Sequence, residues 1–413
     1  MRRLGFASAL GLVVGVLAIV PATPALAALT VTVDVDDVLH VVGSGQGDHI
    51  GVRCNDAGNV EVSGDEPGTG SAACSTIAGI DIAAGGGGDD VSLVKVDPAT
   101  FSALTSVVVA GGDGRDRIKG SPFDDQLLGG PGKDDISADP LAGDEVDGGD
   151  DHDSLSVDVP REVDVSDDTL TTPTKTATFT GIEGLAIDGT SRDDRIDAHD
   201  VTFYISIDGK PGDDRLIGGS GRNSLYGAAG DDTLIGGPHL DFLTGGHGDD
   251  VIRARGGNES VYDDKGHDRI SLGRGRDTFA AWVVGARNVF RGGRGRDVLE
   301  FQELVGEVKV SDSKVATQLG SARLSSIELV RLSASDQPGK PVMFDARRYS
   351  HRLFEDGSPE NDVLLGGSGK DSISGQWGND HLSGGPGNDD LDGGDGIDTC
   401  DGGPGRDRIT NCE

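Results

Sequence analysis

The last part of the chain repeats one nonapeptide in unbroken register. From Gly357 the sequence reads GSPENDVLL, GGSGKDSIS, GQWGNDHLS, GGPGNDDLD, GGDGIDTCD and GGPGRDRIT. A nine-residue unit is too short to bury a core by itself, so it becomes stable only by stacking on further copies. The repeat therefore predicts an all-β fold, a parallel β-roll or β-helix solenoid, rather than a conventional globular domain.

The same unit recurs earlier in the chain, in GGDGRDRIK at Gly111 and in a long run that starts with GKPGDDRLI at Gly209. These blocks and the segments between them suggest a division into seven parts. The parts are a signal peptide (1–27), an N-terminal β segment with degenerate repeats (28–110), a first repeat block (111–156), a β-solenoid connector (157–208), a second block (209–300), a β connector (301–356) and a third block with a disulfide cap (357–413).

Each unit divides into a turn and a short strand. The first six positions form the turn, where glycine permits positive φ and close backbone approach. The last three positions are strand-like, and an aliphatic residue at position eight, such as Leu216 or Leu364, is predicted to face inward. Two nonapeptides make one coil, so each residue stacks on the residue two units further on, about 4.8 Å away.

This stacking places the position-six aspartates of successive coils in a row. Calcium–oxygen distances are about 2.4 Å, so an ion between two stacked turns can touch the aspartates of both coils, with turn carbonyls as further ligands. Without the ion, the row brings like charges close together. We predict about eight well-formed calcium sites. The predicted metal ligands are Asp116, Asp125, Asp134, Asp153, Asp194, Asp214, Asp232, Asp241, Asp250, Asp268, Asp277, Asp297, Asp362, Asp371, Asp380, Asp389, Asp398 and Asp407.

The two-unit coil gives each block two edges. In the second block one edge holds Asp214, Asp232, Asp250 and Asp268, each preceded by glycine two residues earlier. The opposite edge holds Asn223, Asp241, Glu259 and Asp277, with His239 at a glycine position. We predict that the first edge is the better calcium ladder.

Three segments outside the repeats, residues 77–82, 179–187 and 324–332, alternate apolar and polar side chains. Each predicts a β-strand. We interpret them as solenoid turns without metal loops.

The repeats resemble the hemolysin-type calcium-binding repeat family, also called RTX. The resemblance implies a parallel β-roll that binds calcium in its turns through the position-six aspartates. It also implies ordering on export into calcium-rich surroundings. Members of that family from Gram-negative bacteria usually lack a cleaved N-terminal signal, whereas this chain starts with one, which suggests export by the general secretory route.

The start of the chain has the features of a signal peptide. Arg2 and Arg3 precede an apolar run over residues 4–20, and Ala25-Leu26-Ala27 offers a cleavage site. The apolar run is short for a spanning helix and no second one follows, so we predict a secreted protein without a transmembrane anchor.

The net charge is strongly negative, −35 at pH 7. Phosphate would be repelled, so the charge argues against nucleic acid as a partner. The partners that we expect are calcium and an extracellular glycan or protein.

Four cysteines, all in the exported part, predict disulfides because their number is even and the compartment oxidising. Three pairings are possible. The local one, Cys54 with Cys74 and Cys400 with Cys412, is favoured because the two pairs lie far apart in the chain. The second bond would cap the exposed last coil.

A catalytic motif is not found: the chain has neither H-E-x-x-H nor G-x-S-x-G. We therefore predict a calcium-binding protein with a structural or interaction role and no enzymatic activity. The alternative is a polysaccharide lyase or epimerase built on the solenoid, for which Arg347, Arg348, Tyr349 and His351 form a basic and aromatic cluster.

Overall fold

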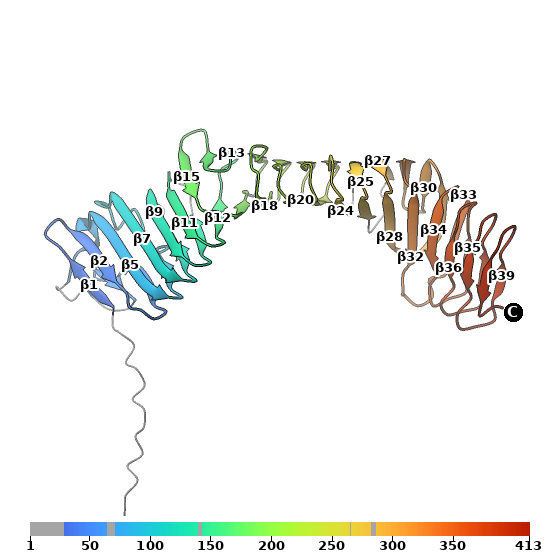
Figure 1. The fold of residues 1–413 in the computed structure, drawn as a ribbon, viewed down its shortest axis with the longest axis horizontal. Coiled ribbons are helices and arrows are strands. Elements are labelled where there is room, and N and C mark those ends of the chain that lie inside the picture. The colour runs from blue at the N-terminus through green and yellow to red at the C-terminus, as the bar shows by residue number, and fades with distance from the viewer. Residues whose placement is uncertain (1–28, 64–70, 139–142, 265, 282–285) are drawn as a thin grey trace, which may run out of the picture.

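The computed structural model describes residues 29–63, 71–138, 143–264, 266–281 and 286–413. The predicted signal peptide lies outside these residues. The molecule is an elongated roll in which short strands run across the long axis, with the N-terminal and C-terminal parts at opposite ends (Figure 1). None of the helices in the described part is long and apolar enough to cross a membrane.

The roll is made of two sheets, here called A and B. Sheet A consists of β1 (Thr30–Val33), β2 (Val38–Val42), β5 (Gly79–Gly87), β7 (Ser106–Gly114), β9 (Asp125–Pro131), β11 (Glu145–Asp150), β13 (Glu162–Val165), β14 (Thr169–Thr171), β15 (Thr176–Thr180), β17 (Arg195–Asp197), β19 (Arg215–Ile217), β21 (Thr233–Ile235), β23 (Val251–Arg253), β25 (Arg269–Gly275), β27 (Ala286–Gly295), β29 (Gly306–Ser311), β30 (Lys314–Ala316), β31 (Ser321–Ser325), β33 (Val342–Arg348), β35 (Val363–Leu365), β37 (His381–Ser383) and β39 (Thr399–Asp401).

Sheet B consists of β3 (His49–Cys54), β4 (Val60–Val62), β6 (Asp90–Ser92), β8 (Arg117–Lys119), β10 (Asp135–Ala138), β12 (Ser154–Asp158), β16 (Gly184–Asp188), β18 (Tyr204–Asp208), β20 (Asn223–Ala229), β22 (Phe242–His247), β24 (Ser260–Asp263), β26 (Thr278–Ala281), β28 (Val298–Leu304), β32 (Leu329–Ala334), β34 (Arg352–Asp356), β36 (Ser372–Ser374), β38 (Asp390–Asp392) and β40 (Arg408–Thr410). A single 3-10 turn, η1 (Cys74–Thr76), completes the elements of the described residues.

Within the repeats the chain alternates between the sheets, and each strand pairs in parallel with the strand two units on. Leu216 on β19 pairs with Leu234 on β21, and Leu225 on β20 pairs with Leu243 on β22. All four side chains are fully buried. The predicted all-β roll, its two-unit coil and its inward-facing position eight are confirmed.

Two antiparallel excursions interrupt sheet A. Strand β14 joins β13 to β15, and β30 joins β29 to β31, each by antiparallel pairing. The excursion at β13–β15 projects from the roll in Figure 1. Both excursions immediately precede one of the alternating segments that we singled out in the sequence.

The prediction that each alternating segment is one strand is wrong for two of the three segments. Residues 179–187 include the end of β15 on sheet A and most of β16 on sheet B, and residues 324–332 similarly span parts of β31 and β32. In residues 77–82 the strand β5 begins only at Gly79. The alternation of apolar and polar residues continues where the chain passes from sheet A to sheet B, because apolar side chains face the core from both sheets.

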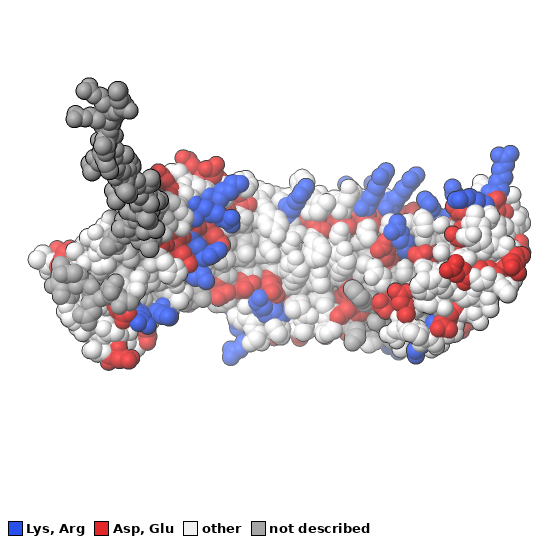
Figure 2. Space-filling model, turned by 90° about the horizontal axis from the view of Figure 1, so that it is seen from below, with Lys and Arg blue, Asp and Glu red and all other residues white. Residues whose placement is uncertain are grey.

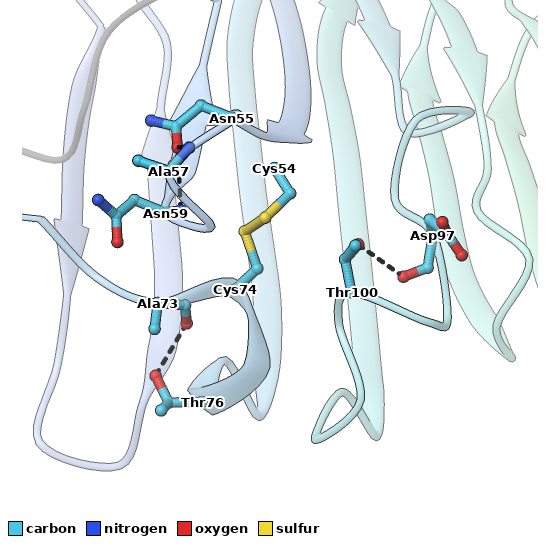
Figure 3. The surroundings of a disulfide bond; sticks show 9 residues. All are labelled: Cys54, Asn55, Ala57, Asn59, Ala73, Cys74, Thr76, Asp97 and Thr100. Carbon is cyan, nitrogen blue, oxygen red and sulfur yellow. Dashed lines mark hydrogen bonds between the residues drawn. A yellow bond between two sulfur atoms is a disulfide. The ribbon is translucent and has the colours of Figure 1, made fainter.

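Both predicted disulfides are present, Cys54–Cys74 and Cys400–Cys412. The first ties the end of β3 to the 3-10 turn η1, next to the turn held by the Asn55 side chain (Figure 3). The second ties β39 to the C-terminus just after β40. Cys400 stacks on the buried Leu382, on the last described strand of sheet A.

Candidate metal centre

Position-six residues form continuous hydrogen-bonded ladders along the edges of the roll. In each ladder the backbone N–H of one residue donates to the side-chain oxygen of its counterpart on the next coil. The longest ladder beside sheet A runs through Asp194, Asp214, Asp232, Asp250, Asp268 and Asn288, with N···O distances of 2.7 to 3.1 Å. The edge that we predicted to be the better one therefore has an unbroken ladder.

The opposite edge of the second block is interrupted. The N–H of Asn223 donates to Asp241 at 2.9 Å, and a separate ladder runs through Glu259, Asp277, Asp297 and Glu328. Among the described residues no hydrogen bond joins Asp241 to Glu259. This difference agrees with the predicted ranking of the two edges, but which edge binds calcium better stays a prediction.

The first block carries a longer ladder than the sequence predicted. Beside sheet B it runs through Asp48, Asp89, Asp116, Asp134, Asp153 and Glu183, at 2.6 to 2.9 Å. Beside sheet A, the backbone N–H of Asp125 donates to the Asp144 carboxylate at 2.9 Å. Asp48, Asp89, Asp144 and Glu183 were missed because insertions and degenerate turns hide their equivalence to position six.

Both edges of the third block are intact. Asp362, Asp380 and Asp398 form the ladder beside sheet A, and Asp371, Asp389 and Asp407 form the ladder beside sheet B, at 2.8 to 3.0 Å. All are buried except Asp407, which is half-buried on the last coil.

Glu183 and Glu328 end their ladders. Each carboxylate accepts the N–H of the preceding aspartate, Asp153 or Asp297, at 2.9 Å. Each glutamate's own N–H returns to the backbone carbonyl of that same aspartate, at 3.1 and 3.3 Å. The segments 179–187 and 324–332 are thus part of the ladders, and our interpretation of them as turns without a metal loop overlooked this role.

Several ladder starts carry a hydroxyl residue four positions before the aspartate. Both the N–H and the hydroxyl of Ser121, Thr190 and Ser358 donate to Asp125, Asp194 and Asp362 respectively. At these coils the repeat has serine or threonine at position two instead of glycine. The carboxylate at the start of the ladder therefore accepts its hydrogen bonds from donors in its own turn.

Most other ladder carboxylates keep one oxygen buried without a hydrogen-bond partner. Among the predicted ligands these are Asp116, Asp134, Asp153, Asp214, Asp232, Asp250, Asp277, Asp297, Asp380, Asp389 and Asp398. Leaving a charged oxygen buried and unpaired is costly, so an arrangement of this kind requires a partner for that atom. A calcium ion, which takes carboxylate and carbonyl oxygens, fits these residues.

Some predicted ligands already have a partner for that second oxygen. The Oδ2 atom of Asp241 accepts the N–H of Gly237, and that of Asp371 accepts the N–H of Gly367. Asn288 donates its Nδ2 to Asp268 at 3.1 Å. The ladder aspartates are therefore not equivalent, although the repeat gives them the same position.

Asp250, Asp263 and Asp268 form a cluster in which one oxygen from each lies within 4.8 Å of the others. All three are buried. Asp263 occupies position one of its repeat, where most units have glycine, and it was missed because we counted only position six. The departure DDKGHD from the usual GGxGxD was the available signal.

Burial changes the protonation of these groups. It raises the pKa of Asp232 and of Asp250 to about 7. The pKa of Asp263 is raised to about 10, first by burial and then by the charges of Asp268 and Asp250. A cation bound here would favour the charged carboxylates that this packing disfavours.

Glycine is required where turns of adjacent coils meet. Gly248 has φ of +143°, and a Cβ on it would collide with the carbonyl oxygen of Gly230. A Cβ on Gly227, at position one, would collide with the Asp232 carboxylate of the same turn. The turns are thus too tight for side chains at these two positions, which keeps backbone carbonyls close to the ladder.

The proposed catalytic cluster is only partly assembled. Tyr349 is buried, its hydroxyl donates to the Ile327 carbonyl at 3.1 Å, and its ring packs edge-on against His351 at 5.6 Å between centroids. Arg347 forms a bidentate ion pair with Asp345, at 2.9 and 2.8 Å. His351 and Arg348 are exposed.

A comparison with protein families finds the same repeats. The family model described as RTX calcium-binding nonapeptide repeat (4 copies) matches residues 110–140, 208–238, 240–258, 244–279, 356–391 and 374–409. The chain carries RTX calcium-binding repeats. The resemblance and the β-roll fold are therefore confirmed, and the repeats support a calcium-binding β-roll protein. No curated protein matches the chain.

Proposed function

We propose that this RTX protein is secreted, folds when it binds calcium, and has a structural or interaction role outside the cell. The observation that carries the proposal is the series of buried carboxylate oxygens without partners along the RTX ladders. An ion that binds the stacked coils but not the unfolded chain stabilises the folded state by its binding free energy.

The residues that would hold calcium are the position-six aspartates of neighbouring coils, together with carbonyls of the glycine turns. Asp263 would add a third carboxylate between Asp250 and Asp268. When bound, calcium supplies positive charge that offsets the repulsion between stacked carboxylates. About eight sites remains our prediction for the number of ions.

Calcium removal should unfold much of the roll. In excess chelator we expect the circular dichroism spectrum to lose β content, because the buried carboxylates then repel one another, and to regain it on titration with calcium. Magnesium at the same concentration is the control, since it demands a smaller octahedral site. A spectrum already fully β in chelator would contradict the proposal.

Two features support secretion. The first 27 residues have the composition of a signal peptide, and both cysteine pairs are disulfide-bonded, which is typical of an oxidising compartment. Expressed from its full reading frame in a bacterial host, the protein should appear in the medium or periplasm with Ala28 as its first residue, as read by mass spectrometry of the intact protein. Recovery of the chain from the cytoplasm with residues 1–27 still attached would count against secretion.

We also propose that the protein is not an enzyme. In the cluster considered for polysaccharide chemistry, Tyr349 is buried in the core and Arg347 forms an ion pair with Asp345. Measurable cleavage or epimerisation of uronate polymers, abolished by His351→Ala, would overturn this part of the proposal.

A further inference from the structure

Within the nonapeptide units, the residue just before the ladder position, at position five, lies exposed on the edge of the roll. Before sheet-B strands this position is basic in many coils, and we call these residues the basic edge. The basic edge consists of Arg115, Lys133, Arg222, Arg276, Arg296, Lys370 and Arg406. Because the strands of sheet B run parallel, their N-terminal ends follow one long edge from coil to coil.

Before sheet-A strands the same position is acidic over much of the roll. Asp124, Asp193, Asp213, Asp231 and Asp249 are exposed there. Asp213 and Asp231 accept the N–H of the next coil's position-five residue, at 2.8 Å in both cases. The two edges of one chain thus carry opposite charge at equivalent positions, although its net charge is −35.

The cations of the basic edge have no acidic partner. Across the described residues no ion pair includes any of the seven, whereas on the acidic edge Asp124 pairs with Lys175 and Asp193 with Arg161. Figure 2 shows Lys and Arg side chains standing out along one long edge over the half nearer the C-terminus.

The charge is densest at two successive turns. Arg274 and Arg294 lie in register on β25 and β27, and Arg276 and Arg296 follow two residues later. Arg276 and Arg296 line two adjacent shallow cavities of about 610 and 540 Å³, the second of which also includes Arg352. Like charges at the spacing of neighbouring strands, about 4.8 Å, repel unless an anion lies between them.

We propose that the basic edge binds a linear glycan that carries carboxylate or sulfate groups, with its chain along the long axis of the roll. Arginine forms two parallel hydrogen bonds with either group. A broad anionic surface such as a duplex or a membrane would also meet the acidic remainder of the molecule, whereas a single thin chain contacts the edge alone. Single-stranded nucleic acid binds by stacking on aromatic rings, and none of the residues of the basic edge is aromatic.

Binding should depend on calcium, and this part rests on the proposed function. Arg276 and Arg296 directly precede Asp277 and Asp297, whose second oxygens are buried without a partner. When calcium neutralises those carboxylates, the field at the edge becomes more positive. By linkage the glycan should then also raise the affinity for calcium.

The test is fluorescence anisotropy with labelled hyaluronan oligosaccharide, in calcium and in chelator, with dextran sulfate as a second probe and neutral dextran as the blank. We expect binding in calcium that weakens about tenfold or more when Arg115, Lys133, Arg276 and Arg296 are all replaced by glutamine, since several weak exposed ion pairs are then lost together. The matched control replaces four exposed cations on sheet A, namely Arg215, Arg253, Arg269 and Arg323, and should change the affinity little.

Equal weakening in the two variants would overturn the proposal, because the effect would then be general charge. So would binding of single-stranded DNA or anionic vesicles through the same edge when neither glycan binds. Binding of dextran sulfate but not of hyaluronan would support a glycan site on the basic edge and show that it recognises sulfate groups. The double variant Arg276→Gln, Arg296→Gln provides the same test if the fourfold variant does not fold. A normal calcium-induced dichroism change without any glycan binding would reject the glycan site on the basic edge and leave calcium-dependent folding intact.

Discussion

The variant Asp232→Asn, Asp250→Asn is expected to bind fewer calcium ions than the wild-type chain and to need more calcium to fold. Asparagine keeps the Oδ1 atom that accepts the N–H of the preceding coil, as Asn288 shows at an equivalent position by accepting the N–H of Asp268. It removes the charge and the unpartnered oxygen of each side chain. The ladder therefore survives while the calcium ligands are lost.

The expected loss is large because the two side chains flank successive gaps of the longest ladder beside sheet A. Each ion that no longer binds removes about 2.7 kcal/mol of stabilisation at a calcium concentration 100 times its Kd. Isothermal titration calorimetry gives the number of ions, and dichroism during a calcium titration gives the folding midpoint.

The chain offers a close control for this variant. Asp231 and Asp249 each precede one of the two ladder residues, are exposed, and also accept a backbone N–H at 2.8 to 2.9 Å. The variant Asp231→Asn, Asp249→Asn removes the same charge and should keep the calcium stoichiometry. If the two double variants lost equal numbers of ions, the position-six aspartates would not be the ligands.

Glu355→Ile is expected to stabilise the protein, by about 2 kcal/mol or more at neutral pH. Glu355 lies on β34 at an inward-facing position, between Leu332 of β32 and Ile373 of β36. It is buried, and neither carboxylate oxygen has a hydrogen-bond partner. An apolar side chain would complete the stack without an unsatisfied polar group.

The stabilisation should depend on pH in a defined direction. Burial, followed by the charges of Asp371 and Asp345, holds the pKa of Glu355 well above its ordinary value of 4.5. The folded state thus binds this proton more tightly than the unfolded chain, so the Glu355 contribution to stability falls as pH rises above 4.5. The gain from Glu355→Ile should therefore be greater at pH 7 than at pH 4.

Thermal unfolding in saturating calcium measures this effect. Ile207 on β18 provides the reverse control, because it is buried between Ile187 and Leu225 in a similar stack, and Ile207→Glu should destabilise the protein. A melting temperature for Glu355→Ile equal to or below that of the wild type at pH 7 would show that the carboxyl group has a partner in solution.

The sequence was sufficient for the repeating part of this fold. A strict period places Leu216 over Leu234 and Asp232 over Asp250, because stacking leaves one register in which the aliphatic residues face inward. Both disulfides followed from the positions of the cysteines. These features depend on spacing alone, which a sequence displays directly.

The departures from the repeat could not be predicted in the same way. Glu183 and Glu328 follow an isoleucine in segments that look like plain strands, and only the corner between the two sheets brings their carboxylates to the ladder. Asp263 replaces a glycine, and its carboxylate reaches the ladder from another position of the turn. Whether an aspartate keeps a free oxygen depends on its neighbours, such as Ser121 beside Asp125.

The ends of the ladders have a consequence for how chains of this type vary in length. Where a ladder starts with a hydroxyl-capped aspartate such as Asp194, or stops at Glu183 or Glu328, the terminal carboxylate is hydrogen-bonded within its own block. A whole block can then be inserted, duplicated or lost at such a boundary without creating an unpaired buried group in the neighbouring block. The similar segments GIEGLAI at Gly181 and SIELVRL at Ser326 are what two copies of one such module would leave in a chain.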